Sequence, residues 1–142
     1  MKIKTSDIVN DTEYKEVVDL IQEYNSSKIS HLEPEKFINK PLEIIAKNSD
    51  NIIIGGIYGR SIWGTLEIKT FVVRDEFRKS GVGTTLIKEA EFESTRRNCE
   101  YISLDTFSFQ APEFYEKMGF IKIGTETDFP KGFDKIYYRK KI

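Results

Sequence analysis

Two glycines, Gly81 and Gly83, stand directly before a helical pattern and are the residues of this chain best suited to bind a phosphate group. The first amide N–H groups of a helix have no partner within the helix, and the helix dipole adds partial positive charge there. Glycine lets the backbone bend so that several amides converge, and it leaves no Cβ in the way of a bulky ligand. Arg78 and Lys79 add two cations beside this loop. The spacing therefore predicts a phosphate cradle made of backbone amides.

Two common phosphate-binding motifs do not fit these residues. A Walker loop requires Gly-Lys followed by Ser or Thr, and that tripeptide does not occur in the chain. A dinucleotide-binding fingerprint requires a third glycine where Leu86 stands. The pattern that remains is Arg-x-x-Gly-x-Gly, over residues 78–83.

This pattern resembles the pyrophosphate-binding motif of the GNAT superfamily, the acyl-coenzyme A-dependent N-acetyltransferases. A second segment, APEFYEKMGF at residues 111–120, resembles the family's Ala-x-x-x-Tyr-x-x-x-Gly-Phe segment. The two motifs occur in the family's order. On these residues the chain is identified as similar to small, single-domain bacterial members of that superfamily.

The elements expected from periodicity and turn residues support the resemblance. Helices are predicted at 12–25, which Asn10 or Asp11 would cap, at 81–97 and at 111–118, with a short one around 35–39. Asn10 has the spacing of a capping box with Glu13. Strands are predicted at 2–5, 42–47, 52–58, 62–73, 101–106, 120–125 and 134–140, with a turn at 59–61. Alternation along 62–73 predicts that Glu67, Phe71 and Val73 share one face. The strands 62–73 and 101–106 are expected to be parallel because a helix connects them.

A GNAT chain has this same order of elements. The resemblance implies an α/β (α+β) fold, with a mixed, mostly antiparallel central sheet flanked by helices. It also implies two splayed parallel strands that hold the acyl-CoA, and one N-acetyltransferase domain over residues 1–142.

The resemblance places the coenzyme on named residues. Main-chain groups of Phe71, Val72 and Val73 would pair with pantetheine, and one of their N–H groups could face the oxyanion of the reaction. The pyrophosphate would lie on the backbone of a loop formed by Arg78, Lys79, Ser80, Gly81, Val82, Gly83 and Thr84. Ser108 stands where many relatives carry an asparagine that contacts the coenzyme.

Two residues are candidates for the chemistry. Tyr115 occupies the motif position where the family often has its general acid, because a phenol is protonated at pH 7 and can protonate a leaving thiolate. Its alternative role is that of a core aromatic residue beside Phe114. Glu67 lies eleven residues before Arg78, the spacing that the histone-acetylating branch uses for its catalytic base. Its alternative role is a surface carboxylate paired with Lys69.

Composition limits the other classes of function. The net charge of the 142 residues is −1, with 22 basic and 23 acidic residues, which disfavours nucleic-acid binding through a broad basic face. No apolar run is as long as a membrane span, and no metal-ligand spacing occurs. The lone Cys99 cannot form an internal disulfide, so a cytoplasmic location is expected and a buried, inert thiol is favoured over an acyl carrier. The only histidine, His31, is expected to be solvated in a polar loop.

The expected activity is transfer of an acetyl group from acetyl-CoA to a primary amine of a small molecule, by direct attack through a tetrahedral intermediate. A protein acetyltransferase acting on a lysine or N-terminus, and a non-catalytic CoA-binding module, are the alternatives. The acceptor would be set by residues 28–40, the turn at 59–61 and the closing hairpin, which carry no motif. The acceptor and the length of the acyl group therefore stay open. A homodimer could form through the hairpin's aromatic residues, which are Phe129, Phe133, Tyr137 and Tyr138.

Overall fold

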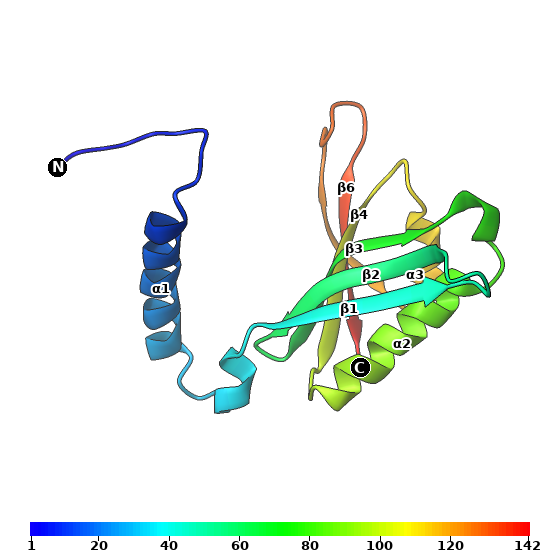
Figure 1. Ribbon diagram of the computed structural model, residues 1–142, viewed down its shortest axis with the longest axis horizontal. Coiled ribbons are helices and arrows are strands. Elements are labelled where there is room, and N and C mark those ends of the chain that lie inside the picture. Colours follow the sequence, from blue (N-terminus) through cyan, green and yellow to red (C-terminus); the bar gives the residue numbers. More distant parts are fainter. The chain divides into compact units, whose positions relative to one another are not determined.

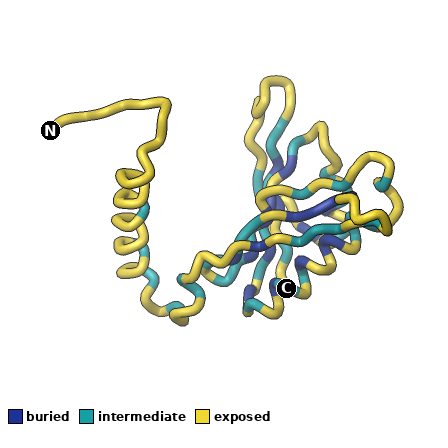
Figure 2. Tube along the Cα trace, viewed as in Figure 1, coloured by how far each residue is buried: buried dark blue, intermediate teal, exposed yellow.

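The computed structural model describes residues 1–142 as two compact units, residues 1–37 and 38–142, which are treated separately. The first unit contains helix α1, Asp11–Lys28. Asn10 caps this helix as predicted, because its Oδ1 accepts a hydrogen bond from the backbone N–H of Glu13 at 2.9 Å. None of the residues of α1 is buried, and Figure 2 colours nearly its whole length as exposed. The apolar residues Tyr14 and Val17 are 62% and 63% exposed.

The strand predicted at residues 2–5 is wrong, since residues 1–9 form no strand. A strand needs a partner for its backbone groups, and none of the pairings in the sheet involves these residues. The short helix predicted at 35–39 is a 3₁₀ helix, η1, at Pro34–Phe37.

The second unit is a six-stranded sheet with two helices. Its strands are β1 (Lys40–Lys47), β2 (Ile53–Ile62), β3 (Thr65–Val73), β4 (Tyr101–Phe107), β5 (Ile121–Glu126) and β6 (Lys135–Lys141). A 3₁₀ turn, η2 (Asp75–Phe77), leads from β3 to helix α2 (Val82–Arg96), and α3 (Pro112–Lys117) follows β4. The strand order is β1-β2-β3-β4-β6-β5, and only β3 and β4 are parallel (Figure 1). The mixed, mostly antiparallel sheet flanked by helices is therefore confirmed.

The core lies between α2 and one face of the sheet. The helix buries Leu86, Ile87 and Ala90. The facing strand residues are Leu66, Ile68, Ile102 and Leu104, each at most 6% exposed. Burying such side chains contributes roughly 1.5–3 kcal/mol each before the cost of ordering the chain is subtracted. Because one set of side chains on β3 and β4 packs in this core, the alternate side chains of these strands point to the opposite face of the sheet.

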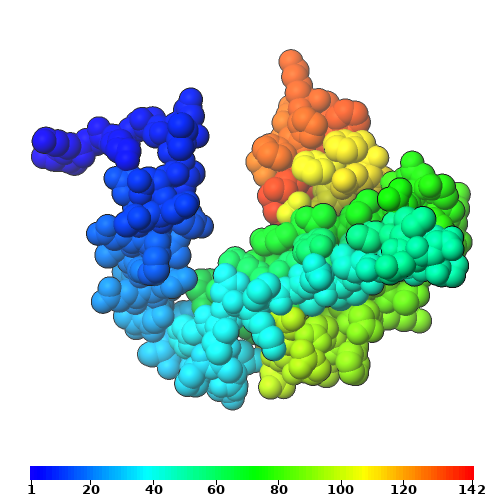
Figure 3. Space-filling view, in the orientation of Figure 1, coloured from blue at the N-terminus to red at the C-terminus, as the bar shows by residue number.

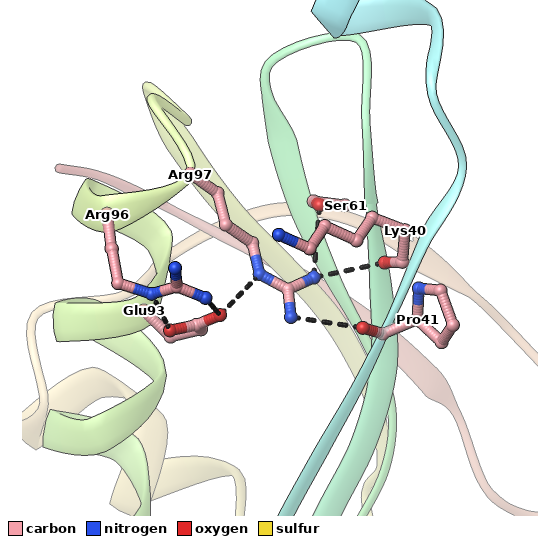
Figure 4. A network of polar contacts seen from close by, with 6 residues as sticks. All are labelled: Lys40, Pro41, Ser61, Glu93, Arg96 and Arg97. Atoms are coloured by element: carbon pink, nitrogen blue, oxygen red, sulfur yellow. Dashed lines mark hydrogen bonds and ion pairs between the residues drawn. The ribbon is translucent and has the colours of Figure 1, made fainter.

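The C-terminal end of α2 is attached to the sheet through the arginine that follows it (Figure 4). Arg97 donates hydrogen bonds to the carbonyl oxygens of Lys40 and Pro41, both at 3.0 Å, and to Ser61 Oγ at 3.1 Å. Its Nε lies 2.7 Å from Oε1 of Glu93, which also accepts from Arg96. The network holds the far end of the helix against β1 and β2.

The hairpin between β2 and β3 differs from the prediction. The turn is at Trp63 and Gly64, which have φ of 51° and 76°, and residues 59–61 lie within β2. The register shifts opposite Gly59, so that Lys69 is an extra residue in β3. A Cβ on Gly59 would lie 2.0 Å from the carbonyl oxygen of Glu67, and only glycine fits there.

This bulge reverses the side-chain alternation along β3. Phe71 and Val73 follow the bulge and pack against the core. Glu67 precedes the bulge and lies between the buried residues Leu66 and Ile68, so its side chain points to the opposite face of the sheet. The predicted common face for Glu67, Phe71 and Val73 is therefore wrong, because an alternation argument assumes a strand without inserted residues.

Candidate active site

The site is built around a split between the two parallel strands. Pairing of β3 with β4 begins at Thr65 and Tyr101 and ends at Ile68 and Leu104. Beyond that point β3 stays paired with β2 up to Val73, and β4 stays paired with β6 up to Phe107. The two strands therefore run apart, as Figure 1 shows, and the bulge at Lys69 lies where they separate.

The predicted pantetheine-binding segment lies on the β3 side of this split. Phe71, Val72 and Val73 follow the last β3–β4 pair and have no partner on β4. Their backbone groups on that side are therefore available to another extended chain, as in β-strand addition. The prediction that these three residues bind the coenzyme is compatible with this geometry and stays a prediction.

The glycine loop forms the predicted arrangement of amides at the start of α2. Gly81 is the N-cap residue with φ of +90°, and no side chain caps the helix. The amides of Val82, Gly83 and Thr84 are therefore left without intrahelical partners. A Cβ built on Gly81 would meet nothing within 4 Å, so glycine is needed there for the backbone conformation and not for space.

Gly83 has a different role, which is close packing. A Cβ there would lie 3.3 Å from Cζ of Phe114 and 3.5 Å from Cζ of Phe71. Those two rings stack with their centroids 5.8 Å apart. Gly83 thus lets α2 approach the rings that line the split, which joins the cradle to the region of Tyr115.

The polar residues of the loop also shape it from within. Arg78 forms an ion pair with Asp75 at 2.9 Å, and its Nε donates to the carbonyl oxygen of Val73 at 3.4 Å. The hydroxyl of Ser80 donates to the carbonyl oxygen of Phe77. Lys79 has φ of 61°. Arg78 remains largely exposed, so its charge is available to an anion at the cradle.

Tyr115 lies in α3 among aromatic rings. Its ring contacts Phe71, Phe114, Phe120 and Tyr138, with centroid distances from 5.4 to 6.1 Å. The residue as a whole is 8% exposed. Its hydroxyl oxygen is not a buried atom without a partner, since Ser94 Oγ is the one atom of that kind. The Tyr115 hydroxyl therefore keeps access to the space outside the core. Burial, followed by the charge of Asp105, raises the pKa of Tyr115 to about 12.

Glu67 is held by two cations on the other face of the sheet. Its Oε2 lies 2.6 Å from Nε of Arg60 and 3.4 Å from Nζ of Lys69. Burial alone would raise the pKa of Glu67, but the hydrogen bond from Arg60 and the two positive charges outweigh it and hold the pKa below its ordinary value. The carboxylate is thus ionised and weakly basic, and its predicted pairing with Lys69 is present.

Ser108 has a partner within the chain. Its Oγ accepts a hydrogen bond from the backbone N–H of Asp134 at 2.9 Å, and its own N–H donates to the carbonyl oxygen of Asp134 at 2.8 Å. These bonds hold the loop after β4 against the start of β6. The suggested contact between Ser108 and the coenzyme stays a prediction.

An aromatic cluster lies at this end of the sheet, formed by Phe107, Phe109, Phe129 and Phe133. Phe107 stacks on Phe109 at 5.3 Å and on Phe129 at 6.1 Å between ring centroids. Phe109 meets Phe133 edge to face at 5.1 Å. In Figure 3 the yellow atoms of the loop after β4 lie against the orange atoms of the β5–β6 loop, and three of the four rings are about half exposed.

Asp105 and Lys135, which lie beside this cluster, were not among the predicted site residues. Asp105 is the first residue of β4 beyond the last pair with β3, and it pairs with Tyr137 of β6. Its Oδ1 lies 4.0 Å from Nζ of Lys135. One signal was available: a charged residue between Leu104 and Thr106, both of which face the core, must point to the other side of the sheet.

Other kinds of site receive little support from the structure. No three histidine, cysteine, aspartate or glutamate side chains are grouped so as to hold a metal ion. None of the helices has the length and apolar character needed to span a membrane. Cys99 is buried and forms no disulfide bond.

Known proteins resemble this chain in both sequence and structure. The family model described as "Acetyltransferase (GNAT) family" matches residues 11–120. A curated acetyltransferase of Agrobacterium fabrum is 30% identical over 142 residues, which cover all of both chains. The crystal structure of an acetyltransferase from Bacillus cereus has a TM-score of 0.85 and 32% identity, and covers 98% of each chain.

A third relative carries the coenzyme. It is a Bacillus anthracis protein assigned as a streptothricin acetyltransferase, whose crystal structure is a complex with acetyl coenzyme A. It has a TM-score of 0.66 and 28% identity, covering 72% of this chain and 64% of its own. The split strands, the amide cradle and the family match together lead to one conclusion: the chain belongs to the GNAT family of acetyltransferases.

Proposed function

We propose that this protein is an acetyl-CoA-dependent N-acetyltransferase whose acceptor is a primary amine of a small molecule. The observation that carries the proposal is the split between β3 and β4, which has free amides at one end and the Tyr115 phenol at its side. The acetyl-CoA complex of the Bacillus anthracis relative supports the choice of coenzyme. The family match runs over residues in both compact units, which favours one N-acetyltransferase domain over residues 1–142.

In this proposal the backbone binds the coenzyme. The amides of Val82, Gly83 and Thr84 receive the pyrophosphate, assisted by the charge of Arg78. The backbone of Phe71, Val72 and Val73 pairs with the pantetheine arm along the open side of β3. One of these N–H groups then faces the oxygen that becomes negative when the amine attacks the thioester.

Tyr115 acts on the leaving sulfur. With a pKa of about 12 its phenol stays protonated throughout the physiological range. A thiol has a pKa near 8.5, so complete proton transfer from the phenol to the thiolate is unfavourable at equilibrium. A hydrogen bond from the phenol nevertheless stabilises the negative charge that develops on sulfur in the transition state. We therefore assign Tyr115 as the hydrogen-bond donor to the leaving sulfur, in place of a general acid that transfers its proton completely.

Glu67 is the proposed base, because an alkylamine is mostly protonated at pH 7 and must lose a proton before it attacks. Its lowered pKa makes Glu67 a weak base. Glu67 therefore removes the proton through a water molecule that it orients. The absence of a disulfide at the lone Cys99 agrees with a cytoplasmic enzyme.

The proposed acceptor class follows the relative that is named for a small molecule, streptothricin. The loop after β4 and the β5–β6 loop also offer exposed rings, those of Phe109, Phe129 and Phe133, and the exposed carboxylate of Asp128. Such a surface suits a compact cation better than an extended peptide, which would need a row of free backbone groups.

The test is release of free CoA thiol from acetyl-CoA in the presence of polyamines, aminoglycosides, amino acids and short peptides, with mass spectrometry of the products. We expect one N-acetylated small molecule for each thiol released. Turnover with peptides alone would contradict the small-molecule acceptor. Calorimetric binding of CoA without turnover of any amine would contradict the transferase and leave a binding module.

A further inference from the structure

The cluster formed by Asp105, Lys135, Phe129 and Tyr137 has the composition of an ammonium-binding site. The Nζ of Lys135 lies 5.2 Å from the ring centroid of Phe129 and 5.4 Å from that of Tyr137. It also lies 4.0 Å from Oδ1 of Asp105. Two ring faces and a carboxylate around one nitrogen are the groups that recognise an alkylammonium ion.

This cluster lies where the acceptor has to enter. Asp105 directly follows Leu104, the last residue of β4 paired with β3, and therefore lies at the opening of the split. Leu104 and Thr106 face the core, so Asp105 lies on the opposite face of the sheet, the same face as Glu67. The charge of Asp105 also acts on the Tyr115 phenol, which approaches the split from the core side. A cation held by Asp105 would thus be close to the reacting groups.

The ion pair between Asp105 and Lys135 is weak enough for another cation to replace Lys135. The carboxylate and the ammonium are at the outer limit of an ion pair, and the side chain of Asp105 is 40% exposed. A pair of this kind contributes little, and an incoming ammonium restores the same charge balance at Asp105. By contrast, Glu67 is already paired with Arg60 at 2.6 Å and with Lys69 at 3.4 Å, so a further cation would have to displace one of them.

We propose that Asp105 receives the positively charged amine of the acceptor, together with the rings of Phe129 and Tyr137, in the place that the Lys135 side chain takes in this structure. The inference deepens the proposed function and rests on it. It specifies the acceptor as a primary alkylammonium ion, and it makes Lys135 an internal competitor for that ion. The amine arrives charged and loses its proton only afterwards, on the same face of the sheet as Glu67.

The experiment uses binding, so that it does not depend on turnover. The CoA-saturated protein is titrated with benzylamine, and with benzyl alcohol as the neutral probe of the same shape, while the backbone amide signals of residues 105–108 are followed by NMR. We expect Asp105→Asn to weaken benzylamine binding by about tenfold. We expect Lys135→Met to strengthen it about threefold, because the competing charge is removed. Benzyl alcohol should respond to neither substitution.

The control is Lys131→Met, which removes a charge from the exposed loop of the same hairpin without touching Asp105. It should bind benzylamine like the wild type. Unchanged benzylamine binding in Asp105→Asn, or unchanged or weaker binding in Lys135→Met, would overturn the inference. Melting temperatures of the variants check that each is folded.

A pH series separates recognition of charge from a structural role. The ratio of benzylamine dissociation constants, Asp105→Asn over wild type, should shrink as the pH rises to about 9.5 and the amine loses its charge. A constant ratio would overturn the inference. Failure of the proposed function looks different: it would leave this binding pattern intact while no amine releases thiol from acetyl-CoA.

Discussion

The two ends of the split between β3 and β4 are built in different ways. At the proposed coenzyme end the candidate binding groups are backbone amides, placed by Gly81 and the start of α2, and side-chain identity matters mainly where a Cβ would intrude. At the acceptor end the candidate groups are side chains, among them Glu67 and Asp105, drawn from β3 and β4. A backbone site is fixed as soon as its helix and turn form, whereas a side-chain site depends on every strand that contributes a residue.

Because the two ends are built differently, substitutions at each end should change different quantities. Changes at the coenzyme end should alter CoA affinity whatever amine is used. Changes at the acceptor end should leave CoA affinity alone and alter the reaction with the amine. Tyr115 lies between the two ends, and substitution there should affect the chemical step most strongly.

Tyr115→Phe should produce the largest effect. It removes the hydroxyl that we propose as hydrogen-bond donor to the leaving sulfur, and it keeps the ring contacts with Phe71 and Phe114. We expect kcat to fall by about 100-fold, with the dissociation constant for CoA within a factor of about two. Steady-state kinetics with the best amine, and calorimetry with CoA, measure the two quantities.

Tyr138→Phe is the matched control for that change. Tyr138 is fully buried and donates its hydroxyl hydrogen bond to Glu116 at 2.9 Å, away from the split. It should lower the melting temperature and leave kcat nearly unchanged. An equal loss of kcat in both variants would show that packing, and not the Tyr115 hydroxyl, accounts for the effect.

Gly81→Ala should weaken CoA binding by about tenfold, which corresponds to 1.4 kcal/mol. Alanine is strained at the φ of +90°, so the substitution should distort the turn that presents the first amides of α2. Calorimetric titration with CoA measures the change.

Gly132→Ala is an unusually close control for Gly81→Ala. Gly132 has φ of +86°, a Cβ there would also meet nothing within 4 Å, and the residue lies in the β5–β6 loop. Both variants should lose similar stability, while only Gly81→Ala should lose CoA affinity. If both weakened CoA binding, the two ends of the split would not be independent.

The coenzyme end was predictable from sequence because its parts are local. The motif at residues 78–83 and the helix after it were placed correctly, and α2 begins at Val82 where the glycines predicted it. The parallel pairing of β3 and β4 followed from the helix between them, and it is confirmed. The same local reasoning placed the Asn10 cap of α1.

The acceptor end was not predictable because its parts come together only across the sheet. The extra residue Lys69 opposite Gly59 reverses the alternation of side chains between the two faces of β3. Gly59 was predicted to be a turn residue, whereas it accommodates this bulge. Asp105 and Lys135 are far apart in sequence and meet only through the pairing of β4 with β6. Residues 2–5 fail for a related reason, because a segment with strand propensity forms no strand without a partner strand.

Arg60→Met tests whether Glu67 serves as the base at the acceptor end. The substitution removes the hydrogen bond and charge that lower the pKa of Glu67, so burial then moves that pKa upwards. If Glu67 removes the amine's proton, the acid limb of the kcat/KM profile should shift to higher pH. The dissociation constant for CoA should not change. An unshifted acid limb would assign the proton transfer to another group.

Glu93→Gln should have the smallest effect on function, because Glu93 belongs to neither end of the split. Arg96 donates hydrogen bonds to Glu93, and although partial burial works against ionisation, these bonds and that from Arg97 lower the pKa of Glu93 to about 2 from 4.5. A carboxyl group with a depressed pKa stabilises the folded state above its ordinary pKa, and that contribution is lost as the pH falls from about 4.5 towards 2. We therefore expect Glu93→Gln to reduce the free energy of unfolding by about 1–3 kcal/mol at pH 7. Its free energy of unfolding should also fall less steeply than the wild type's within that acid window.

Denaturant unfolding at several pH values measures both effects, and CoA titration at pH 7 should show unchanged affinity. Glu91→Gln is a comparison within the same helix, since Glu91 pairs with Lys140 and not with the Arg97 network. A change in CoA affinity in Glu93→Gln would show that the attachment of the far end of α2 to β1 and β2 is transmitted along the helix to the amides at its start. The cradle would then be a property of the whole α2–sheet packing, and the independence of the two ends would hold only while that packing is intact.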